Sequence, residues 1–107
     1  MPRLEISRQD LDHGLVRLRL TGNADLSDVD RLEDAQRVAL EAPETRRLVV
    51  DLENLEFLDS SGIAVMVAGY RSARSRGQRY QVINPRGLVR RVLDLTGVLT
   101  TLTPLTA

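Results

Sequence analysis

The stretch LEFLDSSGIAVM, residues 55–66, decides the fold expected of this chain. Its two apolar segments are separated by DSSG, residues 59–62, where an ordinary core segment would continue. Small polar residues accept hydrogen bonds from the free N–H groups in the first turn of a helix, so they are typical of helix N-termini. The stretch therefore predicts an apolar turn followed by a helix that Asp59 or Ser60 caps.

Upstream of this stretch, the pattern predicts two strands and a helix. Apolar and polar residues alternate over residues 15–22, as in a strand with one solvated face. Residues 4–7 can pair with that strand through the turn 10–14. Residues 26–42 have helical spacing, with Ser27 or Asp28 as the cap. The residues expected to face inward on this helix are Val29, Leu32, Ala35 or Gln36, and Ala39.

The nearly continuous apolar run 47–52 predicts a strand that is covered on both faces, as in a parallel or mixed sheet. Further elements are predicted on the C-terminal side of this run, namely helices over 61–77 and 85–97, a strand over 80–84, and a last short strand or frayed edge over 98–105. In the second of these helices we expect Leu88, Val92 and Leu95 to face inward. The arginine-rich end of the first one, up to Gly77, is most simply a solvated helix end.

Together these elements predict an α/β fold. Residues 1–107 are expected to form a single domain, without a linker or an internal repeat. Its sheet is expected to be mixed but mostly parallel, with four to five strands, βα repeats and packed helices.

Composition excludes several classes of function. Hydrophobic residues make up 42% of the chain and charged residues 28%, which argues against disorder. Fifteen arginines balance fifteen acidic residues, so no net field attracts nucleic acid or an acidic membrane. No run approaches the roughly 18 apolar residues that span a bilayer, and there is no apolar signal segment. We expect a cytoplasmic protein that neither inserts into membranes nor binds nucleic acid directly.

Catalytic and cofactor motifs are equally scarce. The single histidine, His13, stands beside Gly14 in a predicted turn, so a Ser-His-Asp triad would need that turn. Cysteine is absent, and the sequence has no zinc-ligand cluster and no glycine-rich phosphate loop. With three aromatic residues in the chain, stacking platforms for RNA are also lacking. We therefore expect neither a metal nor another cofactor, and no catalysis by this chain alone.

Two acidic loops remain as candidates, NADLSD at 23–28 and FLDSSG at 57–62, each between a predicted strand and a helix. The carboxyl ends of parallel strands meet at one edge of a sheet, where ligands commonly bind. Asp25 could therefore lie close to residues 59–61 if the two strands are neighbours. Taken alone, each loop is more simply a turn with a helix cap.

The order of the motifs adds a resemblance to a known family. GNAD at 22–25 precedes an amphipathic helix, RLVVDLENLEFLDSSGIAVMVAGYRSARSRG spans 47–77, and YQVINPRGLVRRVLDLTGV spans 80–98. This series, over nearly the whole chain, resembles the STAS domain of anti-sigma factor antagonists, regulators of bacterial partner switching. The resemblance implies a STAS-like fold and a protein that binds partners rather than an enzyme.

The resemblance also implies roles for individual residues. Ser60 matches the serine that is phosphorylated in the family, and Asp25 matches the aspartate of an earlier G-x-L-D loop. This chain has Ala24 where the family usually has leucine. Asp59, Ser61 and Gly62 match the remainder of the motif. The expected partner-binding site therefore consists of Asp25, Asp59, Ser60, Ser61 and Gly62.

The implied partner is an anti-sigma factor that is also a serine kinase of the GHKL type. The unphosphorylated family member binds it and thereby frees a sigma factor, and phosphorylation ends the binding. A serine phosphatase acting on phosphorylated Ser60 is the second implied partner.

Two alternatives stay open. The chain could be a STAS module of a signalling scaffold or a transporter-associated complex, in which Ser60 is never phosphorylated. It could also be a small hydrolase or phosphotransferase with Asp59 as the nucleophile, although no metal-binding set or general base accompanies that residue.

Overall fold

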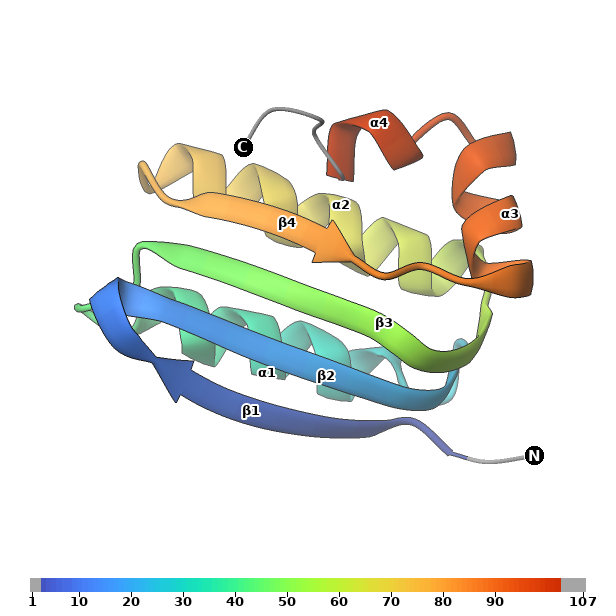
Figure 1. Cartoon of the computed structure of the whole chain (residues 1–107), viewed down its shortest axis with the longest axis horizontal. Helices are drawn as coiled ribbons and strands as arrows, with labels where there is room; N and C mark the ends of the chain where they lie inside the picture. The colour runs from blue at the N-terminus through green and yellow to red at the C-terminus, as the bar shows by residue number, and fades with distance from the viewer. Residues whose placement is uncertain (1–2, 103–107) are drawn as a thin grey trace.

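Two antiparallel strands form one side of the sheet. The computed structural model describes residues 3–102 (Figure 1). In it, β1 (Glu5–Leu11) pairs with β2 (Leu15–Ala24). The 3-10 turn η1 (Asp12–Gly14) joins them, and Gly14 has a φ of 74°, a left-handed conformation that glycine adopts without strain. The predicted hairpin is confirmed.

Two parallel strands complete the sheet, whose order is β1-β2-β3-β4. β3 (Arg47–Leu58) pairs with β2, and β4 (Arg79–Ile83) pairs with β3. Val49 and Val50 are both buried although they point to opposite faces, which confirms that β3 is covered on both sides. The mixed, mostly parallel sheet is the predicted one, with four strands.

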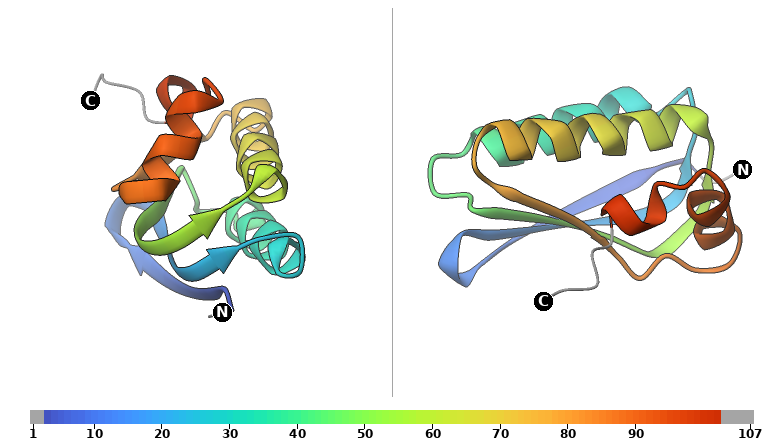
Figure 2. Two further views of the ribbon diagram at one scale, coloured as in Figure 1. Left: turned by 90° about the vertical axis from the view of Figure 1, so that its right-hand side faces the viewer. Right: turned by 90° about the horizontal axis from the view of Figure 1, so that it is seen from above.

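The crossover helices α1 (Val29–Glu41) and α2 (Ser60–Ser75) lie side by side on one face of the sheet (Figure 2). The positions predicted to face inward on α1 are buried or half-buried, as the helical spacing required. Gly69 lets α2 approach α1 and β4, because a Cβ atom there would lie 2.6 Å from Gln36 Nε2. The buried Gln36 amide in turn donates to Val65 O at 3.0 Å and accepts from the Tyr80 hydroxyl.

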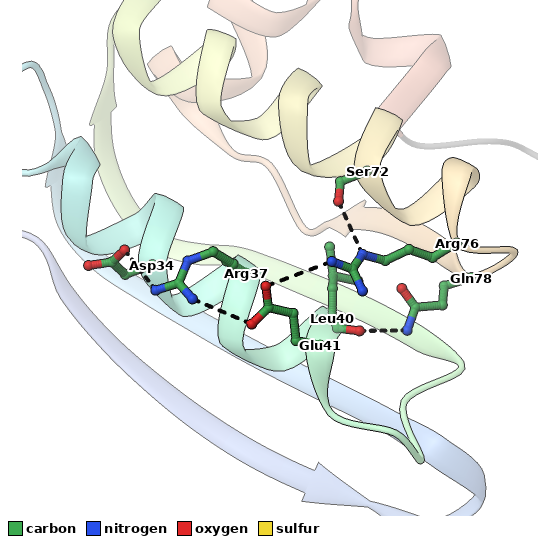
Figure 3. A network of polar contacts seen from close by, with 7 residues as sticks. All are labelled: Asp34, Arg37, Leu40, Glu41, Ser72, Arg76 and Gln78. Atoms are coloured by element: carbon green, nitrogen blue, oxygen red, sulfur yellow. Dashed lines mark hydrogen bonds and ion pairs between the residues drawn. The ribbon is translucent and has the colours of Figure 1, made fainter.

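Polar side chains join the two helices toward their C-terminal ends (Figure 3). Arg37 donates to Asp34 at 3.2 Å and to Glu41 at 3.4 Å, and Glu41 lies 3.8 Å from Arg76. These side chains are about half exposed, so each pair contributes less than about 1 kcal/mol. The apolar core beneath them, rather than this network, holds the helices on the sheet.

The prediction of a last short strand or frayed edge over 98–105 is wrong for its described part. The chain leaves α3 (Gly87–Leu95) through Gly97 and forms the short helix α4 (Leu99–Leu102). Leu102 is fully buried, because α4 packs beside β4 and does not pair with it as a strand. Residues 103–105 lie outside the described residues.

The predicted inner face of α3 is wrong at Leu88 and Leu95, whereas Val92 packs against the core as predicted. Val89 and Leu93 are the fully buried positions, whereas Leu88 is 52% and Leu95 is 77% exposed, and Val92 is half-buried. All five residues are apolar, so their spacing alone does not distinguish the covered side of this helix. The contact with β3 selects it.

The sheet is covered unequally on its second face. There α3 and α4 lie over β3 and β4, and no helix of the described residues covers β1 and β2 (Figure 2). Among residues 3–102, the structure has no helix with the length and apolar character needed to cross a membrane.

Candidate functional site

The two acidic loops begin next to one another at the carboxyl edge of the sheet. Ala24, the last residue of β2, is the register partner of Leu58, the last residue of β3. The backbone N–H of Asp59 donates to Ala24 O at 3.3 Å. The structure therefore brings Asp25 and the DSSG residues together, as the parallel arrangement predicted.

Irregular pairing makes the two strands end together. Arg19 is opposite Asp51, but Thr21 is opposite Asn54 and Asn23 is opposite Phe57. β3 thus uses more residues than β2 over the same length, and the pairing shifts register twice. Without these shifts, the end of β3 would not lie opposite the end of β2, and the DSSG residues would not lie beside Asp25.

Asp59 caps α2, whereas Ser60 does not. Asp59 has an extended backbone with a φ of −108° and a ψ of −175°. Its Oδ1 accepts from Ser61 N at 2.9 Å and from Gly62 N at 3.1 Å. Of the two alternatives for the cap, the carboxylate is therefore the one that satisfies the first turn.

Ser60 is the first residue of α2 and is exposed. Within residues 3–102, its hydroxyl has no hydrogen-bond partner. A serine held at a rigid helix start with a free hydroxyl is accessible to another protein, and nothing in its own fold occupies it.

Gly62 sets the distance between the two loops. A Cβ atom at this position would lie 2.4 Å from Leu58 Cδ1 and 2.9 Å from the carbonyl oxygen of Ala24. Only glycine lets the first turn of α2 pack this closely against the strand ends. Ser61, half-buried in the same turn, contributes the backbone N–H that Asp59 binds.

The Asp25 loop is ordered by its own hydrogen bonds. Asp25 Oδ1 accepts from Ser27 N at 3.0 Å, and its carbonyl oxygen accepts from Asp28 N at 3.0 Å and Val29 N at 3.1 Å. Between these residues, Leu26 is 75% exposed. Leu26 was not predicted to be a site residue, because an apolar residue in a loop has no sequence pattern that separates an exposed position from a buried one.

Asp28, one of the two residues predicted to cap α1, occupies the N-cap position, but its side chain makes no capping hydrogen bond. Its buried carboxylate instead accepts from Leu4 N at 3.1 Å and from Arg3 at 3.2 Å. The bond from Leu4 N, followed by that from Arg3, outweighs burial and holds the pKa of Asp28 below its usual value. Asp28 thereby ties the loop to the start of β1.

The described residues give no support for a catalytic centre around Asp59. Residues 3–102 contain no group of three or more histidine, cysteine or acidic side chains arranged to hold a metal ion. His13 lies in η1, before the first residue of β2, whereas Asp25 follows the last. A strand of that length spans about 30 Å, so His13 cannot act on Ser60.

Comparison with known proteins now gives the family. A family model described as "Mlab, STAS domain" matches residues 7–104. The chain belongs to the STAS domain family. This confirms the resemblance that the order of its motifs predicted.

Relatives of this STAS domain are anti-sigma factor antagonists. One of Paenibacillus polymyxa, named an anti-sigma F factor antagonist, is 29% identical over 91 residues, which cover 83% of this chain and 78% of that protein. An anti-sigma-B factor antagonist of Listeria monocytogenes is 25% identical over 95 residues, covering 89% of this chain and 81% of that protein.

Solved structures of anti-sigma factor antagonists are similar in fold to this chain. An anti-sigma factor antagonist from Mycobacterium paratuberculosis is similar with a TM-score of 0.83 and 27% identity, covering 95% of this chain and 84% of that one. Unphosphorylated SpoIIAA, also an anti-sigma factor antagonist, is similar in fold with a TM-score of 0.80 and 23% identity, covering 92% and 85%. Its phosphorylated form from Bacillus has a TM-score of 0.74 and 22% identity, covering 92% and 88%.

Proposed function

We propose that this STAS domain is a cytoplasmic anti-sigma factor antagonist regulated at Ser60. Its unphosphorylated form binds an anti-sigma factor that is also a serine kinase of the GHKL type, and so releases a sigma factor. Phosphorylation of Ser60 ends the binding, and a serine phosphatase restores it. The observation that carries the proposal is the exposed Ser60 hydroxyl at the capped start of α2, beside the Asp25 loop.

The chain acts in this proposal as a substrate rather than an enzyme. Among the described residues no side chain accepts a hydrogen bond from the Ser60 hydroxyl, so the kinase must supply the nucleotide, the magnesium ion and the catalytic side chains. Asp59 holds the helix start that presents Ser60, and Asp25 offers the kinase a carboxylate at the same edge. Ser61 and Gly62 shape the turn between them.

Local charge is sufficient to explain the switch. A phosphate would add about −1.5 to −2 charges at pH 7. The N–H groups of Ser61 and Gly62 already donate to Asp59, so they are not free to neutralise that phosphate. The new charge would therefore stand beside the carboxylates of Asp59 and Asp25. A partner fitted to a bare hydroxyl would lose several kcal/mol, or about a thousandfold in affinity.

The test is phosphorylation by the anti-sigma kinases of the source organism. Each kinase is incubated with the protein and ATP, and the product is analysed by intact mass and peptide mapping. We expect one phosphate on Ser60 with one kinase, none on Ser60→Ala, and normal modification of the control Ser75→Ala, because Ser75 is an exposed serine at the other end of α2. Binding to that kinase should weaken at least a hundredfold after phosphorylation.

The contrary outcome is equally specific. A protein that no such kinase modifies or binds would contradict the proposal. Capture of a transporter subunit or a signalling scaffold, at equal strength by the wild type and by Ser60→Ala, would establish the alternative role of a STAS module without phosphorylation at Ser60.

A further inference from the structure

The face of the sheet opposite to α1 and α2, which α3 and α4 cover only over β3 and β4, carries an excess of positive charge. Register places four arginines on this face, opposite to α1 and α2, namely Arg17, Arg19, Arg47 and Arg79. They belong to three neighbouring strands, so the fold and not the sequence gathers them. Glu5, at the far end of β1, is on the same face by register with Thr21.

One carboxylate on this face, that of Asp51, already pairs with an arginine. Asp51 is 1% exposed and accepts hydrogen bonds from Arg17, from Glu53 N at 3.0 Å and from Asn84 at 3.1 Å. Arg19 lies 3.8 Å from it and is half exposed. Asp51 and Glu5 therefore balance two of the four arginines and leave about two positive charges on the face.

Two of the arginines stand directly opposite one another. Arg47 and Arg79 are register partners on β3 and β4, and like charges in that position destabilise a sheet. Arg47 donates to the neutral amide oxygen of Gln81, and no carboxylate lies within ion-pair distance of Arg79 among residues 3–102. An anion bound here would remove the repulsion.

A hollow of about 270 Å³ opens on the same face, lined by Ser7, Arg8, Gln9, Arg17 and Arg19. By register, Ser7 and Gln9 stand opposite Arg19 and Arg17 and add a hydroxyl and an amide as hydrogen-bond donors. Arg17 Nε is buried and has no partner among the described residues. The hollow is of a size for a small molecule rather than for a protein segment.

We propose that the hollow on the uncovered face of β1 and β2 binds a small polyanion that carries at least two phosphate groups. The guanidinium fork matches phosphate oxygens in geometry and charge. A polyanion of this kind would contact Arg17 and Arg19 in the hollow, and Arg47 and Arg79 on the neighbouring strands add positive charge to the same face of the sheet. This site is separate from the Ser60 edge and does not rest on the proposed function.

The experiment is a titration of the protein with pyrophosphate at low ionic strength, followed by amide chemical shifts. We expect saturable shifts at Ser7, Gln9, Arg17 and Arg19, unchanged in Ser60→Ala. A parallel titration with adenosine diphosphate distinguishes the sources of the phosphate. If adenosine diphosphate binds with higher affinity than pyrophosphate, the site recognises nucleotides. If the two affinities are equal, the site recognises the phosphate groups alone.

Matched variants locate the site. Arg19→Gln should weaken binding about tenfold or more, because it removes one charge-assisted contact. Arg71→Gln removes an exposed arginine from α2, on the covered face, and should leave the affinity unchanged. Arg47→Gln provides a second variant in case the first is poorly folded. Absence of saturation, shifts confined to other surfaces, or equal weakening by Arg19→Gln and Arg71→Gln would overturn the proposal.

Discussion

Replacing Asp59 by alanine removes the acceptor of two backbone N–H groups at the start of α2. Asp59 Oδ1 accepts from Ser61 N at 2.9 Å and from Gly62 N at 3.1 Å. Loss of a side-chain cap costs about 1 kcal/mol, within a range of about 0.5–2. Loss of a negative charge at a helix N-terminus costs about 0.5 kcal/mol more. Asp59→Ala should therefore destabilise the protein by about 1.5 kcal/mol.

Asparagine separates the two contributions. Asp59→Asn keeps an acceptor oxygen and removes only the charge, so it should cost about 0.5 kcal/mol. For a domain of this size, the alanine variant should melt about 8 °C below wild type and the asparagine variant about 3 °C below. Glu56→Ala is the matched control, because Glu56 is an exposed carboxylate near the same turn without a capping role.

The assay is urea unfolding at pH 7, followed by circular dichroism, with the slopes compared among the variants. Equal destabilisation by alanine and asparagine would show that the cap contributes nothing and that only charge matters. A change below about 0.3 kcal/mol for alanine would refute the capping argument as a whole.

The remaining predictions concern the rest of the carboxyl edge and the sheet. Gly62→Ala should lower the free energy of unfolding by about 2 kcal/mol, as measured by urea unfolding, because its methyl group would clash with Leu58 and with the backbone of Ala24. The higher helix propensity of alanine does not offset this clash. A variant as stable as wild type would contradict this prediction. Burial raises the pKa of Asp51, but the bonds from its arginine, backbone and asparagine donors outweigh burial and leave that pKa below 3.8. Asp51→Asn should therefore be less stable than wild type at neutral pH, and the gap should narrow as the pH falls through the lowered pKa, whereas a gap independent of pH would be the contrary result. Leu26→Ser should leave stability unchanged and weaken binding to the anti-sigma kinase about tenfold, as measured by calorimetry, because this leucine is exposed in an ordered loop; unaltered affinity would remove it from the binding surface.

Much of the fold follows from local patterns that depend on one segment alone. The period-2 alternation of β2 and the helical spacing of α1 each favour one structure, because only that structure buries their apolar side chains on one side. The apolar run of β3 is short and rich in valine, which favours a strand over a buried helix. The DSSG residues likewise mark the start of α2 through hydrogen bonds that are local in sequence. The resemblance to a family added the roles of Asp25 and Ser60, which stay predictions.

Other features depend on contacts between distant segments, and the sequence left them open or misplaced them. α3 has apolar residues on more than one side, so the neighbouring strand decides that Val89 and Leu93 are the buried ones. The apolar run around Leu102 became a helical turn because it packs beside β4 without pairing with it. Asp28 binds Leu4 N rather than its own helix, a contact between residues 24 positions apart.

Local patterns in the sequence locate most of the helices and strands and the two acidic loops between them. Tertiary packing brings the loops together, since this required β2 and β3 to be neighbours and β3 to absorb two register shifts. It also gathered Arg17, Arg47 and Arg79 from three strands onto one face. The physical reason is the same in each case: local hydrogen bonds and side-chain periodicity are encoded within a few residues, whereas strand order, register and the choice of a covered face arise from packing among segments far apart in the chain.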